Sequence, residues 1–481
     1  MSPIVIVVLV IYLVAVFLIG LWAGGKSKNM TDFLLAGRKL TLWVAVMTIS
    51  ASWFGGGLLI GMGQKTWTSG YIMYFYPLNA LFGLVFAGLL IKKMRGFTKF
   101  STVTEYLESR YNSKLLRTLC SLLSLVALIG LIGSQVTAVV SVLTNFGAAN
   151  PTVIAIIATI VLIIYTSIGG FLAVTVTDCV QIILVILGII AATIISVNHV
   201  GGLGTLFSTL NSQAASLPDG FTKWFGTSDQ GISYILYMII PPIMYALIGQ
   251  DLYQRLFACN SLKTARRASI ISGILVFCLV LFPATMGLVA KVLYPDLANG
   301  AQSIPTLIIN FLPPLAAGIV LAAILAAIMS TADSLMSAAT SHFMNDIYTQ
   351  YIDKSADINS KKLLNLSRAF TAIVGFAAMI VALVKYDIIA LCIDSYTLYS
   401  SGVFAPIILG VLWKKATKEG AFTGLAFGVI LSIMGIAGVS YGKIPTVVMA
   451  GGASVISMVI VSLLTYKGEK TKEETTPAEV A

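Results

Sequence analysis

The stretch LAAILAAIMSTADSLMSAATSHFMNDIY at residues 321–348 decides how the rest of the chain is interpreted. It is apolar enough to cross a membrane, yet Ser330, Thr331, Asp333 and Ser334 stand together in its middle. A carboxylate and several hydroxyls at bilayer depth are costly unless something binds them. This polar cluster therefore marks a candidate functional site.

Three residues of this stretch share one face of the predicted helix. Ala327, Ser330 and Thr331 follow the spacing i, i+3, i+4. Two hydroxyls and a backbone carbonyl are hard oxygen ligands, the kind that a small hard cation needs. The alternative is that the hydroxyls only pack between membrane helices, which is common. The segment alone does not choose between a cation site and packing.

The composition predicts an all-α polytopic membrane protein. Of the 481 residues, 58% are apolar and only 10% are charged, which is too little polar surface for a soluble protein of this length. Because runs of roughly 20 apolar residues mark spanning helices, we predict about thirteen. They are expected at 3–24, 40–64, 71–91, 117–147, 151–169, 174–198, 229–254, 268–293, 303–344, 366–384, 386–413, 419–441 and 444–466.

The distribution of basic residues predicts the orientation. With the N-terminus outside and the C-terminus in the cytoplasm, the predicted cytoplasmic loops hold all but five of the 30 Lys and Arg residues. This is the positive-inside bias of a plasma (inner) membrane protein. A nucleic-acid surface would instead need basic residues clustered on a soluble face, so the net charge of +11 does not indicate nucleic acid. The predicted external lysines are Lys65, Lys223, Lys291, Lys385 and Lys443.

The predicted spans fall into two sets of five. Residues 40–198 form the first set and 229–413 the second, and an odd number of spans per set places the two in opposite orientations, as in an inverted repeat. The remaining segments are a first helix and loop at 1–39, an extracellular loop with a possible short interfacial helix at 199–228, two further helices at 414–467, and a disordered tail at 468–481.

Each set opens with a helix that we expect to be interrupted. The first carries Gly55, Gly56 and Gly57, and glycines destabilise a helix. The second carries Pro241-Pro242 and then Gly249, and proline frees helix carbonyls. Breaks at matching positions of two repeats indicate the binding site of a transporter. The alternative is that membrane helices simply tolerate Gly and Pro.

Five local patterns resemble the sodium/solute symporter family and span most of the chain in family order. They are FLLAGRKLTLWVAVMTISAS at 33–52, TVTEYLESRY at 102–111, YTSIGGFLAVTVTDCVQ at 165–181, AAIMSTADS at 326–334 and GVLWKKATKEGAFTG at 410–424. The resemblance implies a LeuT-type core of two inverted five-helix repeats with broken first and sixth core helices. It also implies one helix before the core and two after it.

The resemblance places a Na⁺ site between the first and eighth core helices. The implied ligands are the carbonyls of Ala51, Phe54 and Ala327 and the hydroxyls of Ser330 and Thr331. This set agrees with the helix face deduced above. Carbonyls at a helix break have no partner within the helix and are free to bind a cation.

A second cation site is implied at Asp178, Asp333 and Ser334. Asp333 stands where the family pattern has a hydroxyl, which would strengthen a second cation site or leave two acids sharing one proton. Asp178 follows a Gly-Gly pair, so a hydrogen-bonded structural acid near a helix end is the alternative for that residue.

The family pattern also suggests where a solute contacts the chain. For each aromatic among the candidates, packing against lipid or another helix is the alternative interpretation. The candidates are Trp53, Leu58, Tyr76, Asn79, Gln135, Tyr245, Gln250 and Asp394.

Asp394 is singled out because it is an acid inside an apolar span with no Lys, Arg or His in the surrounding core segments as we delimit them. A cation, a proton or hydrogen-bond donors must compensate it. An unpaired acid there would favour a solute with an amino group. The alternative is hydrogen bonding to Ser395, Tyr396 or a neighbouring helix.

These patterns predict Na⁺-driven symport of a small polar organic solute, such as an amino acid or amine, by alternating access. A sugar or monocarboxylate is the alternative solute, and a channel or sensor the alternative class.

The patterns around Trp53 and Ser330 resemble the choline-transporter branch, but Gly249 stands where that branch has a tryptophan. No Walker motif and no catalytic residue are predicted. We expect a monomer whose partners are Na⁺, the solute and membrane lipid.

Overall fold

The computed structural model describes residues 2–25, 29–94, 99–144, 150–227, 231–355, 360–384, 388–442 and 444–467. Within these ranges the chain is helical, with no strand and one isolated bridge between Leu40 and Cys259. The predicted disordered tail at 468–481 lies outside the described residues.

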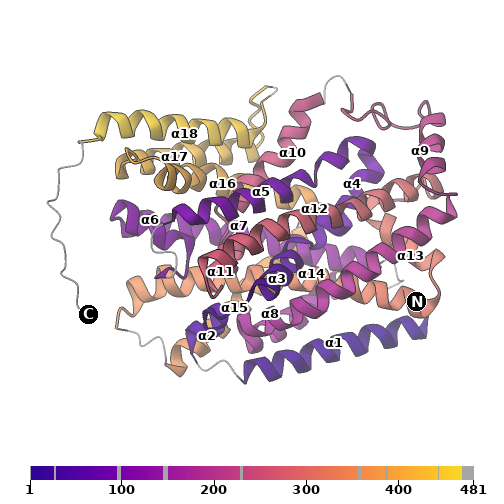
Figure 1. Cartoon of the computed structure of the whole chain (residues 1–481), viewed down its shortest axis with the longest axis horizontal. Coiled ribbons are helices and arrows are strands. Elements are labelled where there is room, and N and C mark those ends of the chain that lie inside the picture. Colours follow the sequence, from indigo (N-terminus) through magenta and orange to yellow (C-terminus); the bar gives the residue numbers. More distant parts are fainter. Residues whose placement is uncertain are drawn as a thin grey trace.

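Ten long helices hold most of the apolar runs and lie roughly along one axis, with α1 at one side and α17 and α18 at the other (Figure 1). They are α1 (Pro3–Gly24), α7 (Lys114–Thr144), α8 (Pro151–His199), α10 (Gly231–Ala246), α12 (Leu262–Leu293), α14 (Pro314–His342), α15 (Lys361–Val384), α16 (Ile388–Leu412), α17 (Lys418–Ile436) and α18 (Thr446–Thr465).

Shorter helices complete the core and its two ends. They are α2 (Met30–Leu35), α3 (Leu42–Trp53), α4 (Met62–Ser69), α5 (Leu78–Leu90), α6 (Val103–Tyr111), α9 (Leu203–Ser212), α11 (Gln250–Phe257) and α13 (Ser303–Phe311). Short helical segments of other pitch are η1 (Ala36–Arg38), η2 (Gly57–Gly61), η3 (Gly70–Phe75), η4 (Ile91–Lys93), η6 (Gly300–Gln302) and η7 (Phe343–Ile352). Helix α9 lies within the loop for which a short helix was predicted.

The number of spans differs from the thirteen predicted. Within the described residues, ten helices are long and apolar enough to cross a membrane, or eleven if the bent pair Leu42–Trp53 and Gly57–Phe75 is one span. Two predicted spans, 151–169 and 174–198, fall within the 49 residues of α8. Helix α5 has only 13 residues, so it does not qualify alone. The multi-pass architecture is confirmed, and the count of thirteen is not.

Helix α8 changes direction at Gly170, whose backbone angles are φ 61° and ψ −167°. A side chain is strained at this φ, and a Cβ would also lie 2.4 Å from Cδ2 of the buried Phe33. Glycine is therefore required both by the backbone conformation and by the close approach of α2. The two predicted spans meet here without an intervening loop.

Both predicted helix breaks are present. Helix α3 ends at Trp53, and Phe54 leaves the helical conformation with φ −89° and ψ 53° before η2 begins. Helix α10 ends at Ala246, and Gly249 is extended with φ −69° and ψ 126° just before α11. The proline pair lies inside α10 instead of at the break, which falls several residues later.

Helix α14 occupies the centre of the molecule. It packs against α1, α7, α8, α3 and α15, and almost every residue from Ala317 to His342 is buried. The polar cluster of residues 330–334 is therefore surrounded by protein and not by lipid. This placement brings it beside the first helix break.

Candidate cation and solute sites

The hydroxyls of α14 meet the last turn of α3. Oγ of Ser330 lies 2.9 Å from the carbonyl oxygen of Ala51 and 3.1 Å from that of Ala327. Oγ1 of Thr331 lies 2.8 Å from the carbonyl oxygen of Ser52 and 3.1 Å from that of Ala327. The structure thus brings together four of the five predicted Na⁺ ligands and adds the carbonyl of Ser52, which the sequence analysis did not name.

The fifth predicted ligand, Phe54, lies at the break itself. It caps α3 by donating its N–H to the carbonyl of Ser50. The next residue, Gly55, is pressed against Thr331, since a Cβ there would lie 2.1 Å from Oγ1 of Thr331. The donors are all carbonyl or hydroxyl oxygens, and the carbonyls belong largely to a helix end with no onward partners. This chemistry suits a small hard cation.

The second predicted cation site contains a positively charged side chain. Nη2 of Arg255 lies 3.3 Å from Oδ2 of Asp178 and also donates to Oγ of Ser334. Nε of the same guanidinium lies 3.1 Å from Oγ1 of Thr48, which in turn donates to Asp178 at 2.5 Å. Arg255 and Asp178 are both completely buried. The guanidinium therefore neutralises Asp178 from within the fold.

Asp333 adds a second carboxylate to this group. Its Oδ1 accepts a long hydrogen bond of 3.4 Å from Ser334, while its buried Oδ2 has no hydrogen-bond partner in the described part of the chain. The buried Oδ1 of Asp178 also has none there. The guanidinium of Arg255 thus contacts one of the two carboxylates, that of Asp178, and one oxygen of each carboxylate is unsatisfied within the described residues. Buried unsatisfied oxygens of this kind are a fit for one further proton or cation.

The sequence analysis missed Arg255 because it ended the span at residue 254 and assigned this arginine to a cytoplasmic loop. The predicted end of this span is therefore too early, because Arg255 continues α11 and is fully buried. A signal was present in the sequence, because Arg255 follows Asp251 at the i, i+4 spacing of one helix face.

A central cavity lies beside the Na⁺ candidates and encloses about 550 Å³, its openings to solvent included. Six of the eight predicted candidates for solute contact line it, and Gln250 and Asp394 do not. Ser52 and Thr331 line it too, so the cavity and the cation candidates share residues. The lining consists of Ser52, Trp53, Gly55, Gly57, Leu58, Tyr76, Asn79, Leu131, Gln135, Pro242, Tyr245, Asp251, Thr331, Leu335, Cys392 and Tyr396.

Polar groups from both broken helices reach this cavity. Gln135 accepts a hydrogen bond of 2.8 Å from the N–H of Gly56, which fixes its amide against the first break. The buried Nε1 of Trp53 has no hydrogen-bond partner among the described residues. At the second break, the hydroxyl of Tyr245 donates to Oδ1 of Asp251 at 2.7 Å. Asp251 is a cavity acid that the sequence analysis did not name.

Asp394 does not reach the central cavity. It lines a separate hollow with Val126, Gly130 and Ser395. Cys392 and Tyr396, which are spaced i and i+4 on α16, face the central cavity. A residue two positions from either is rotated by roughly 200° around the helix, so Asp394 projects from the opposite side. The structure therefore does not bring this predicted residue to the solute site.

Gln250 also lies away from the central cavity. Its Oε1 accepts a hydrogen bond of 2.9 Å from the N–H of Val103, and its Nε2 donates to the carbonyl of Ser101 at 2.9 Å. It thus joins α11 to the start of α6, one helix position away from the cavity residue Asp251. Its contacts indicate a structural link between two elements, not a solute contact.

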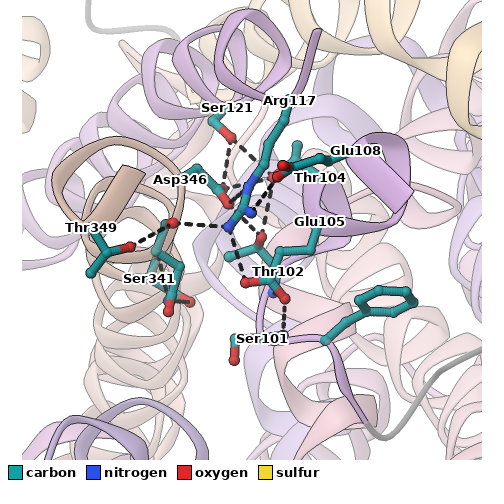
Figure 2. A network of polar contacts seen from close by, with 12 residues as sticks. Ser101, Thr102, Thr104, Glu105, Glu108, Arg117, Ser121, Ser341, Asp346 and Thr349 are labelled. Atoms are coloured by element: carbon teal, nitrogen blue, oxygen red, sulfur yellow. Dashed lines mark hydrogen bonds and ion pairs between the residues drawn. The ribbon is translucent and has the colours of Figure 1, made fainter. Parts of the chain in front are cut away.

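A network of charged residues ties α6 to α7 and η7 (Figure 2). Arg117 donates to Asp346 at 2.6 Å, to Glu108 at 2.8 Å and to Glu105 at 3.0 Å. Asp346 is fully buried and accepts further hydrogen bonds from Thr102, Thr104, Ser121 and His342. These short charge-assisted bonds hold the three elements together, on the side of the molecule that Gln250 also contacts.

Comparison with known proteins agrees with this geometry. The sequence profile of the Sodium:solute symporter family matches residues 33–428. The sodium/glucose cotransporter of Vibrio parahaemolyticus is 27% identical, covering 87% of this chain and 82% of its own. The high-affinity proline transporter PutP of Bacillus subtilis (strain 168) is 29% identical, covering 93% and 95%. A substrate-bound, outward-open Na⁺-coupled sialic acid symporter superposes with a TM-score of 0.83 at 23% identity, covering 96% and 98%.

Proposed function

This chain belongs to the sodium:solute symporter family, and we propose that Na⁺ entering the site between α3 and α14 drives uptake of a small polar organic solute held in the central cavity. The LeuT-type fold and Na⁺ coupling are properties of this family of transporters. The proposal concerns which residues of this chain bind the ion and the solute, and in which direction they move.

One observation carries the proposal. Thr331 contributes its hydroxyl to the cation candidates and also lines the central cavity. Ser52 contributes its carbonyl oxygen to the same candidates from the end of α3, and it also lines the cavity. An ion that binds these oxygens fixes the end of α3 against α14 and so shapes the wall that the solute contacts. A shared wall of this kind couples two ligands because each binds better to the arrangement that the other stabilises.

The residues proposed for Na⁺ are Ala51, Phe54, Ala327, Ser330 and Thr331, with Ser52 as a further carbonyl. Asp178, Asp333 and Ser334 remain proposed as a second cation position, with Arg255 as the charge that the protein itself supplies there. One guanidinium neutralises one of the two carboxylates, which leaves place for one monovalent cation or proton. Trp53, Tyr76, Asn79, Gln135 and Tyr245 remain proposed for the solute.

The named relatives carry glucose or proline, so a sugar and an amino acid are both represented among similar proteins. We propose a multi-pass inner-membrane protein with its N-terminus outside and its C-terminus in the cytoplasm. The positive-inside distribution supports that orientation, and the solute site is contained within one chain, which supports a functional monomer.

A flux assay in proteoliposomes tests the proposal. The purified chain is reconstituted, and uptake of labelled proline, alanine, choline, glucose, myo-inositol and lactate is measured with an inward Na⁺ gradient, with an equal K⁺ gradient, and with the Na⁺ gradient collapsed by an ionophore. We expect accumulation of at least one solute above its outside concentration with the Na⁺ gradient alone. Uptake that only equilibrates a solute, regardless of Na⁺, would contradict symport.

A further inference from the structure

We propose that the central cavity selects a solute carrying a cationic nitrogen, with Asp251 as its counter-charge. The inference rests on the proposed function, because it assumes that the solute occupies this cavity. It extends that function by assigning the substrate class and a residue that determines it.

Asp251 is well placed to act on a solute. It stands in the first turn of α11, directly after the helix break, and lines the central cavity with only 6% of its surface exposed. It is the one acid among the described residues that line this cavity, and no Lys, Arg or His is among them. The cavity wall therefore carries a formal charge of −1 when Asp251 is ionised.

The protein compensates this charge only in part. The hydroxyl of Tyr245 donates to Oδ1 of Asp251 at 2.7 Å, and the N-terminus of a helix favours an anion slightly. The nearby Arg255 is engaged elsewhere: its Nη2 serves Asp178 and Ser334, and its Nη1 donates to the backbone carbonyl of Asp251 and not to its carboxylate. A neutral hydroxyl does not replace an opposite charge at this depth. A cationic ligand would supply the positive charge that compensates Asp251.

The rest of the lining suits the same ligand. Trp53, Tyr76 and Tyr396 contribute aromatic surface to the cavity, and ring faces attract a cationic nitrogen. Because no basic residue lines the cavity, a simple anion would meet Asp251 without any compensating charge. The partnerless Nε1 of Trp53 is a neutral donor, which would serve the carbonyl or carboxylate of a zwitterion.

Gly249 leaves room for the hydrogen-bonded side chains of Tyr245 and Asp251 at the second break. A Cβ at this position would lie 2.8 Å from Oδ1 of Asp251 and 2.9 Å from Cε1 of Tyr245. Contacts this short would push the carboxylate or the ring out of place. The absence of a side chain at Gly249 thus allows the acid to face the cavity while it stays bonded to Tyr245.

Ligand-induced shifts of the thermal midpoint of the purified full-length protein test the inference. The probes are proline, alanine, glycine betaine and choline, the uncharged isostere of choline in which carbon replaces nitrogen, glucose and lactate, each titrated with Na⁺ and with K⁺. We expect Na⁺-dependent stabilisation by one or more of the nitrogen cations and none by the carbon isostere, glucose or lactate. Na⁺-dependent binding of glucose or lactate instead would overturn the assignment and leave symport intact.

Substitutions of Asp251 then test whether this residue is the counter-charge of the solute. Asp251→Asn keeps the shape and should weaken the binding of the active cation at least about tenfold, equivalent to about 1.4 kcal/mol, while stabilisation by Na⁺ alone is retained. Asp251→Glu keeps the charge and should retain more affinity than the Asn variant. Asp394→Asn, which removes an acid outside the cavity, serves as the matched control and should bind like the parent. Unchanged affinity in Asp251→Asn, with Na⁺ stabilisation intact, would overturn the role of Asp251. If no probe binds in a Na⁺-dependent way, the assignment of a cationic solute fails, and the flux assay decides separately on symport.

Discussion

Nη2 of Arg255 lies 3.3 Å from Oδ2 of Asp178, and both side chains are completely buried where sequence analysis alone expects only a second cation site. The arginine comes from the second half of the broken helix α10–α11, and the aspartate from the second half of α8. The pair thus links the two repeats through the interior of the molecule. Removing one charge of the pair should therefore destabilise the protein more than removing both charges together would suggest.

We expect Arg255→Gln alone to destabilise the protein by about 3–5 kcal/mol, because it leaves Asp178 buried without an opposite charge. The double variant Arg255→Gln/Asp178→Asn should lose clearly less than the sum of the two single variants, since neither charge then remains. Denaturation of the four proteins in mixed micelles measures this double-mutant cycle. Strictly additive losses would show that the ion pair is not the relevant interaction.

The first helix break offers a test by way of a single methyl group. Gly55→Ala would place a Cβ 2.1 Å from Oγ1 of Thr331, so we expect the apparent affinity for Na⁺ to fall at least about tenfold. Gly57→Ala in the same break meets only Sγ of Cys392 at an ordinary 3.6 Å. Its Na⁺ affinity, measured without solute, should stay close to that of the parent. Equal behaviour of both variants would argue against a site at Thr331.

Gln250 is expected to contribute to stability and not to solute binding. Gln250→Ala should leave solute affinity nearly unchanged, since its side chain bonds Val103 and Ser101 and not the cavity. It should lower stability by about 1–3 kcal/mol, because the backbone groups at the start of α6 lose their partner. Solute binding and thermal unfolding of the same preparation separate the two effects. A large loss of solute affinity with unchanged stability would return Gln250 to the solute site.

The fold and the Na⁺ candidates could be predicted because their signals are local in the sequence. Hydropathy marks the spans, glycines mark the first break, and helical spacing places Ala327, Ser330 and Thr331 on one face. The contacts of that face with Ala51 follow from the family resemblance and are present in the structure.

The roles of Asp251, Asp394 and Arg255 could not be predicted, because they depend on how each helix is rotated and on where a span ends. Asp394 and Asp251 are both acids in broadly apolar segments, and only packing shows that Asp251 faces the cavity while Asp394 faces away. Arg255 resembles a loop residue when spans are delimited by hydropathy, because a buried arginine is stabilised by a partner 77 residues away in the sequence. The i, i+4 spacing of Asp251 and Arg255 is visible in the sequence, but the pairing of Arg255 with Asp178 is tertiary and is not.

The most direct test of the account is the binding of ²²Na⁺ to the purified full-length protein in the absence of solute, comparing the parent with Ser330→Ala/Thr331→Ala. Ser454→Ala, which removes a buried hydroxyl on α18 far from the site in sequence, controls for handling of the variants. The account predicts that the double variant needs at least about ten times more Na⁺ for half-saturation, since two of its oxygen ligands are lost, while the control matches the parent. A double variant that binds ²²Na⁺ with the affinity of the parent would contradict the site.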